Sequence, residues 1–520
     1  MPTALAGSTS KTLLTNLALA GIGAGLAFAL VIIPSTGLKT KFVLAVAAGF
    51  LLIAGAYIAG NVRLFTLWVL MLTLPLALSK HFGPVLEKMG GESEFRIEVS
   101  DPFLLILGLF VARDLWRGNR PGLRIPKVAW LALAIMLQGL IPILLGPYRT
   151  TAAHEVVRMV KVLVLFVVLV NELTTPKLVL QCAYALTFSA LVQSLVGLGE
   201  KINGKLLGLA LLGETSPQTV AQLAMDVQGM NVFRVSAFLM HPNLFGIFLA
   251  TLLPIAVGVF LLRIGAPQRL YCLLCVLVGV PALIASFSRS GWASFGAAIA
   301  VLTVVVFLHQ SLRARLLLPA CIAGLALMIV GLVYSEAIFK RLFESRANAT
   351  IAREMLKEDA WKLIWQKPVL GWDLNSYALN VPRVMGLGPR ASRKMWGKLF
   401  PVVHNTYMLW WAETGIVGLL MNLWLWGWVI VIGLRNLRVR SEVLFVINAA
   451  CLGAMSAFIV DGFFSFSVRM NAVCRLYWVL AAMILAIHYC RLRESTAARG
   501  PAQVQARPDL ALDPVGAVRA

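Results

Sequence analysis

The chain has 520 residues, of which 59% are hydrophobic and only 13% are charged, and its mean hydropathy is +0.84. An ordinary soluble domain has about a quarter of its residues charged, so this composition excludes that class and predicts a membrane protein. The formal net charge of +23 falls mostly in short loops between apolar segments. It therefore does not indicate a nucleic acid partner.

Fourteen apolar stretches are candidates for spanning helices, because about 20 apolar residues cross a bilayer with every backbone polar group paired. They lie near residues 12–33, 42–60, 64–79, 102–113, 128–146, 156–170, 177–199, 241–262, 270–287, 291–308, 315–334, 405–433, 443–460 and 471–490. Three of them are short, so we predict 12–14 transmembrane helices. The first stretch contains a mimic of a signal-peptide cleavage site, Ala27-Phe28-Ala29, but its apolar run continues to Ile33. We expect a retained helix.

Short loops rich in Lys and Arg orient the chain, because such loops stay in the cytoplasm. The clearest are 113–127, 263–269, 313–315, 435–440 and 491–493. Placing them inside makes the spans alternate consistently, with both termini inside and a polar tail, 494–520, that we expect to be disordered. The segments between the other helix ends then lie on the outer side, which in a bacterium is the periplasm. Among them, residues 335–404 hold twelve Lys or Arg against six Asp or Glu, an excess that favours contact with a polyanion.

Two polar clusters lie at predicted outer ends of spans. Arg234 precedes His241-Pro242-Asn243, where Pro242 suits the first turn of the following helix. Ser288-Arg289-Ser290 joins two apolar spans with almost no loop, so Arg289 is held at the bilayer boundary, where an unpaired charge is costly. Its planar fork suits bidentate binding of phosphate. Interfacial anchoring and a snorkelling arginine are the alternatives for these two clusters.

Two further features complete the outer face. His404-Asn405 opens the helix that carries Glu413, and a histidine titrates near neutral pH, as a general base must. A structural histidine is the alternative. Residues 354–377 have helical spacing of apolar residues up to Pro368 and Gly371, which predicts an amphipathic helix on or near the membrane.

Several weaker signals lie outside these clusters. Arg158 and Lys161 share one helix face near the outer end of a span and could bind phosphate, although snorkelling explains them equally well. Cys272 and Cys275 form a C-x-x-C inside an apolar run without a second ligand pair, which favours packing over zinc or redox chemistry. The sequence has no P-loop, H-E-x-x-H or D-x-D motif. We therefore expect no metal and no cofactor.

Together these segments resemble the O-antigen ligase and O-antigen polymerase superfamily of bacterial envelope glycosyltransferases. The resemblance covers roughly 230–465 and rests on motifs in the family's order, namely Arg234…His241-Pro-Asn243, Ser288-Arg289-Ser290-Gly291, Trp361…Pro368-Val-Leu-Gly371 and His404-Asn405…Glu413-Thr-Gly415. The long outer loop before His404 is most similar to the ligase branch. The resemblance implies an all-α polytopic membrane protein of the GT-C type, with a large periplasmic loop.

The family's activity supplies a specific expectation for this chain. Ligases of this kind move polysaccharide from undecaprenyl pyrophosphate to lipid A–core in the periplasm, without ATP or metal. The resemblance implies catalytic roles for His404 as base and for Arg289 and Arg234 as a pyrophosphate clamp, with inversion at the anomeric carbon. Ser288, His241, Asn243, Asn405, Arg158 and Lys161 are expected to bind substrate. The partners expected are the lipid-linked donor, lipid A–core and the bilayer of the inner membrane.

The sequence also fits other functions. The same residues fit an O-antigen polymerase or a protein O-oligosaccharyltransferase, and a flippase or exporter of lipid-linked sugars is the alternative outside the enzymes. We divide the chain into residues 1–334 and 405–490 as two parts of the transmembrane bundle, 335–404 as the large periplasmic loop with amphipathic helices, and 491–520 as a cytoplasmic tail.

Overall fold

The computed structural model describes residues 55, 57, 60–76, 78–82, 91–209, 213–214, 225–227, 230–310, 312–316, 347–385 and 402–497. The spans expected near 12–33, 42–60 and 315–334 lie wholly or mostly outside these residues. The same holds for the tail 494–520 and for parts of the loop 335–404.

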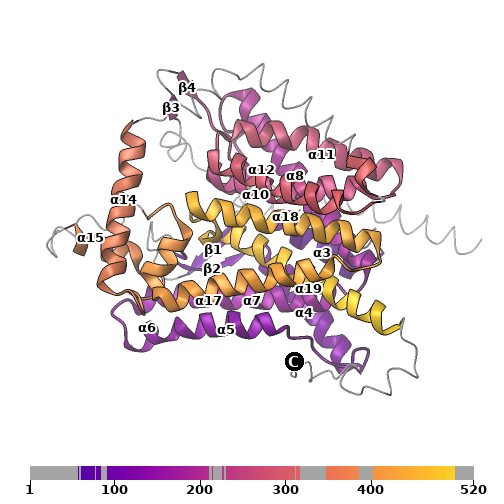
Figure 1. Cartoon of the computed structure of the whole chain (residues 1–520), viewed down its shortest axis with the longest axis horizontal. Helices are drawn as coiled ribbons and strands as arrows, with labels where there is room; N and C mark the ends of the chain where they lie inside the picture. The colour runs from indigo at the N-terminus through magenta and orange to yellow at the C-terminus, as the bar shows by residue number, and fades with distance from the viewer. Residues whose placement is uncertain are drawn as a thin grey trace, which may run out of the picture.

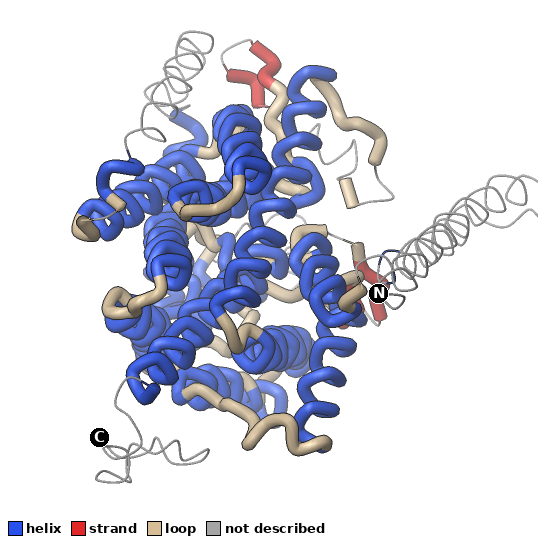
Figure 2. The backbone as a smooth tube through the Cα atoms, turned by 90° about the vertical axis from the view of Figure 1, so that its right-hand side faces the viewer, coloured by secondary structure: helices blue, strands red, loops and turns tan. Residues whose placement is uncertain are grey.

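The described chain is a bundle of helices with two small hairpins at its edges (Figures 1 and 2). The helices are α3 (Val62–Thr73), α4 (Asp101–Trp116), α5 (Lys127–Gln138), α6 (Leu140–Leu145), α7 (Arg149–Glu172), α8 (Pro176–Asn203), α10 (Pro242–Leu261), α11 (Ala266–Ala285), α12 (Arg289–Phe307), α14 (Ala347–Gln366), α15 (Tyr377–Val384), α17 (Thr406–Asn436), α18 (Glu442–Phe464) and α19 (Asn471–Ala497). Short 3-10 turns, η2 (Ala237–Leu239), η3 (Arg313–Leu316) and η4 (Ser467–Arg469), lie between them. Antiparallel pairs form between β1 (Ser79–Phe82) and β2 (Phe95–Glu98), with Ser79 opposite Glu98, and between β3 (Met225–Val227) and β4 (Met230–Val232).

Eight helical segments of the described chain are long and apolar enough to cross a membrane, namely α5 with α6, α8, α10, α11, α12, α17, α18 and α19. This confirms the prediction of an all-α polytopic membrane protein. Helix α3 has 12 residues and α4 has 16, while α7 is longer, with 24 residues, but carries several charged side chains. The count of 12–14 spans stays a prediction, because three of the expected spans lie mostly outside the described residues.

Helices α10 and α19 form the centre of the bundle. Nearly every side chain of α10 is buried, and this helix packs against α8, α11, α12 and α18. Helix α19 is apolar and buried in the same way, and it packs against α7, α17 and α18. A helix that is hydrophobic all round belongs in the interior, so these two positions follow from composition.

Helix α14 stands across one end of the bundle, at the left of Figure 1. It begins at Ala347, seven residues before the expected amphipathic segment 354–377, and ends at Gln366, two residues before Pro368. Its apolar residues pack against α15 and the start of α17, in a small core of their own that includes Leu363, Tyr377 and Leu409.

Helix α17 is broken at Gly415, whose φ of 67° lies in the left-handed region. The turn after α14 passes through this break, because the amide of Ile416 donates to Pro368 O over 2.8 Å and the amide of Trp372 donates to Ala412 O over 3.0 Å. A Cβ atom on Gly415 would collide with the carbonyl of Val369. Glycine is therefore required where these two backbones meet.

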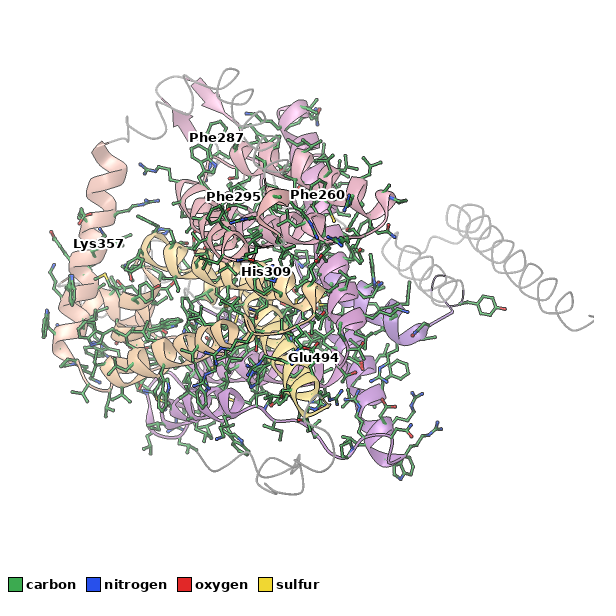
Figure 3. The ribbon with its side chains drawn as sticks, turned by 45° about the vertical axis from the view of Figure 1, so that its right-hand side comes forward. Phe260, Phe287, Phe295, His309, Lys357 and Glu494 are labelled. Atoms are coloured by element: carbon green, nitrogen blue, oxygen red, sulfur yellow. The ribbon has the colours of Figure 1, made fainter. Side chains whose placement is uncertain are left out.

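The basic turns gather at the opposite end of the bundle from α14. Arg315 pairs with Glu442 over 2.7 Å, and the Arg440 amide donates to the Glu494 carboxylate over 3.3 Å. In Figure 3, Lys357 lies at the left of the molecule and Glu494 lies well apart from it, below the middle. The Lys- and Arg-rich short loops expected on one side of the membrane thus correspond to one end of the bundle, and α14 lies at the other end.

Candidate functional site at the α14 end of the bundle

Three helices begin at the α14 end, and each begins with a polar cap predicted as a site residue. His241 Nδ1 accepts the Asn243 amide at the start of α10 over 3.0 Å. Ser288 Oγ accepts the Gly291 amide at the start of α12 over 3.2 Å, and Asn405 Oδ1 accepts the Met408 amide at the start of α17 over 2.9 Å. These caps satisfy backbone donors that a helix leaves unpaired. The positive ends of three helix dipoles therefore point toward the same region.

A cavity of about 520 Å³ lies in this region. Its walls come from the starts of α10, α12 and α17, the end of α18, and α14, and they are formed by Asn243, Arg289, Ser290, Ala293, Arg353, Glu354, Lys357, His404, Phe463 and Phe464. Figure 3 shows Lys357 on α14, across from the bundle. Arg289 and His404, 115 positions apart in the chain, thus face one space, as expected from their placement at helix ends.

Arg234 lies behind the cavity wall and contacts it through Asn243. Its Nε donates to the Ser286 carbonyl and its Nη2 donates to Asn243 Oδ1, each over 2.9 Å. Only 9% of Arg234 is exposed, and Asn243 stands between it and the cavity. The structure thus brings Arg234, Asn243 and Arg289 into one cluster, with Arg234 in its inner layer.

The cations that face the cavity are only partly neutralised. Within the described chain, Arg289 has no ion pair, and Lys357 pairs with Glu354 over 2.8 Å on the exposed surface, where such a pair contributes little. Burial lowers the pKa of Arg353, and the nearby Arg289 lowers it further. Two guanidinium groups that repel each other across one cavity favour binding of an anion there.

The two histidines of the site are neutral at physiological pH. Burial, and then the charge of Arg353, lower the pKa of His404 to about 4. Burial, then Arg234, then His404 lower the pKa of His241 to about 4. A neutral imidazole can accept a proton, which is the state a general base needs.

Arg158 and Lys161 are not part of the cavity wall. Arg158 pairs with Glu155 and donates to the carbonyl of Arg469 over 3.0 Å. Lys161 pairs with Asp101 over 2.5 Å. Both cations are paired with carboxylates of α7 and α4, so they are not available to an anion in the cavity.

Sequence reasoning missed three contributors to this region. Arg353 and Lys357 lie one turn apart on α14, a spacing that could have been read from the predicted amphipathic helix. Asp461, buried in the last turn of α18, faces the hydroxyls of Ser290 and Ser467. No sequence pattern singled out Asp461, because its neighbours come from other helices.

Comparison with known proteins supports the resemblance seen in the motifs. Residues 273–423 match the family model described as O-antigen ligase, and these residues include Arg289, the cavity wall of α14, and His404. No curated protein matches the chain. The match supports the resemblance seen in the motifs: residues 273–423 of this polytopic membrane protein are similar to the O-antigen ligase family model.

Proposed function

We propose that the protein transfers a glycan from undecaprenyl pyrophosphate to a sugar hydroxyl of lipid A–core, on the periplasmic face of the inner membrane. The family match supports transfer of the O-antigen ligase or polymerase type. One observation carries the finer proposal: a neutral imidazole, His404, and the cations Arg289 and Arg353 border a single cavity.

The arginines have the role of binding the pyrophosphate. Arg289 and Arg353 supply guanidinium forks suited to phosphate oxygens, and Lys357 adds an ammonium group at the same wall. Arg234 holds Asn243 in place from behind. As the bond between the sugar and the pyrophosphate breaks, negative charge grows on the leaving oxygen, and fixed cations stabilise that charge without reorganisation.

His404 has the role of general base. The acceptor hydroxyl loses its proton to the imidazole while its oxygen forms a bond to the anomeric carbon. The bond from that carbon to the pyrophosphate oxygen breaks in the same step, and the electron pair leaves with undecaprenyl pyrophosphate. One displacement of this kind inverts the anomeric centre. The energy comes from the donor's own pyrophosphate linkage, so the step uses no ATP.

The test is a transfer assay with purified protein and a lipid-linked donor. His404→Ala should lower turnover by about 10²–10⁴-fold, the usual contribution of a general base. Arg289→Ala should lower it by about 10²–10³-fold, the usual loss when one charge-stabilising donor is removed. Both variants should keep the elution volume and thermal unfolding of the wild type. Near-normal turnover in either variant would contradict the assignment.

The acceptor is tested in the same assay. Lipid A–core, a second lipid-linked repeat and a pilin-like protein are each supplied with one donor. We expect glycan on lipid A–core; product on the lipid-linked repeat or on the protein would indicate a polymerase or a protein O-oligosaccharyltransferase. Movement of donor across vesicles without any transfer would favour the flippase alternative.

A further inference from the structure

His404 is oriented by packing. Its Nδ1 is buried, and no group of the described chain forms a hydrogen bond with it. The ring lies against Phe466, with 5.4 Å between centroids and 46° between planes, within the range of favourable aromatic pairs. In many sites a carboxylate or a carbonyl bonded to the second ring nitrogen orients a histidine base. Here the ring of Phe466 takes the place of such a hydrogen-bond partner.

The turn that carries Phe466 is bonded to the start of α17. Thr406 Oγ1 donates to the Ser465 carbonyl over 2.9 Å, and Asn405 Nδ2 donates to the Phe463 carbonyl over 3.3 Å. Both bonds lie directly beside the contact between His404 and Phe466, one and two residues after His404 in the chain. They fix the spacing between the two rings.

The other end of this turn is held by a buried group of charges. Arg469 Nη2 lies 2.9 Å from Glu413 Oε2, and its Nη1 lies 3.4 Å from Glu155 Oε1. Arg158 donates to the Arg469 carbonyl and pairs with Glu155, so two cations meet two carboxylates. Phe466 also packs against the small core under α14. The partly buried ring of Phe466 therefore lies between this small core and His404.

We infer that Phe466 is a positioning residue for His404, and that residues 465–469 form the platform that holds it. This inference rests on the proposed function, in which His404 is the base. Nothing in the motifs of the sequence singled out Phe466, which lies 62 positions after His404. A base whose ring is misplaced slows the chemical step, while binding of the donor by the arginines is unaffected.

The test compares three variants at this position. Phe466→Ala should lower kcat by about 10- to 100-fold, with the KM for the donor unchanged. Phe466→Leu should lie between this variant and the wild type, and Phe466→Tyr, which keeps the ring, should restore most of the rate. Removing the ring also exposes the imidazole to water. The acidic limb of the pH profile should therefore move up toward the ordinary pKa of histidine.

Leu379→Ala is the matched control, because Leu379 packs against the same small core. Equal losses of kcat in Leu379→Ala and Phe466→Ala would overturn the inference, as would an unchanged kcat in Phe466→Ala. His404→Ala separates the two hypotheses. If His404→Ala is inactive and Phe466→Ala is normal, only the positioning role fails; if His404→Ala keeps its activity, the proposed function fails as well.

Discussion

At the scale of single residues, the site depends on groups whose charge state is set by burial. His404 and His241 are neutral because burial and neighbouring guanidinium groups disfavour their protonated forms. Arg158 and Arg469 lie within ion-pair distance of Glu155 and Glu413 inside the protein, so two basic side chains face two acidic ones. The two histidines are proton acceptors, and the group of two arginines and two glutamates holds the turn before α19 in place.

The pH dependence of transfer follows from the lowered pKa of His404. Because the neutral imidazole is the active form, activity is present above the pKa and is lost as the pH falls through it. We expect the acidic limb of kcat/KM near pH 4, well below the ordinary histidine value of about 6.5. The measurement is kcat/KM from pH 4 to 8 with the fold checked at each pH. A limb at pH 6.5 would mean that His404 is not buried as described.

The buried charges predict a compensating pair of substitutions. Arg469→Met leaves Glu413 and Glu155 with one cation for two carboxylates, and breaking a buried pair in this way costs about 3–5 kcal/mol. Adding Glu413→Gln restores the balance of charge and should recover part of the loss. Thermal unfolding in detergent measures both variants. A double variant no more stable than Arg469→Met would show that these charges do not act together.

The residues also show what a sequence can and cannot predict about a site. Arg289, Asn243 and His404 were predicted together because each lies at the end of an apolar helix, and helix ends on one side of a membrane are close. Arg158 and Lys161 have the same signature, but the sequence does not show that Glu155 and Asp101 neutralise them. Those contacts depend on packing between helices, which periodicity does not encode.

At the scale of elements, α14 and the broken helix α17 form one unit. The turn 367–373 passes through the break at Gly415. Backbone amides and carbonyls of this turn form hydrogen bonds with the backbone of α17 there. The sequence predicted that α14 would end before Pro368, but it gave no reason for the two glycines Gly371 and Gly415. The structure supplies one: the two backbones touch at these positions.

Substitution of Gly415 tests this unit. Gly415→Ala adds a Cβ at a positive φ and against a carbonyl, and the backbone strain alone costs about 1–3 kcal/mol. We expect a lower unfolding temperature and loss of transfer, because α14 forms part of the cavity wall. The control is Gly427→Ala on the same helix, where an added Cβ meets no atom within 4 Å. Equal behaviour of the two variants would contradict the description of the break.

At the scale of the whole molecule, the bundle has a polar cavity at one end and basic turns at the other. Composition predicted spanning helices, of which the described residues contain eight, whereas the alternation inferred from the distribution of Lys and Arg stays a prediction. The path of α14 across the bundle could not be predicted, because an amphipathic helix can lie on any surface with a matching apolar face. The proposed function requires the α14 end to face the periplasm.

Accessibility to a membrane-impermeant maleimide tests that requirement most directly. The single substitutions Lys357→Cys and Arg493→Cys place thiols near the cavity and at the opposite end, and the six cysteines of the described chain are buried. In spheroplasts we expect Lys357→Cys to be labelled, with protection by the lipid-linked donor, and Arg493→Cys to be labelled only after permeabilisation. Labelling of Arg493→Cys alone in sealed spheroplasts would place the cavity on the cytoplasmic side and contradict both the topology and the proposed function.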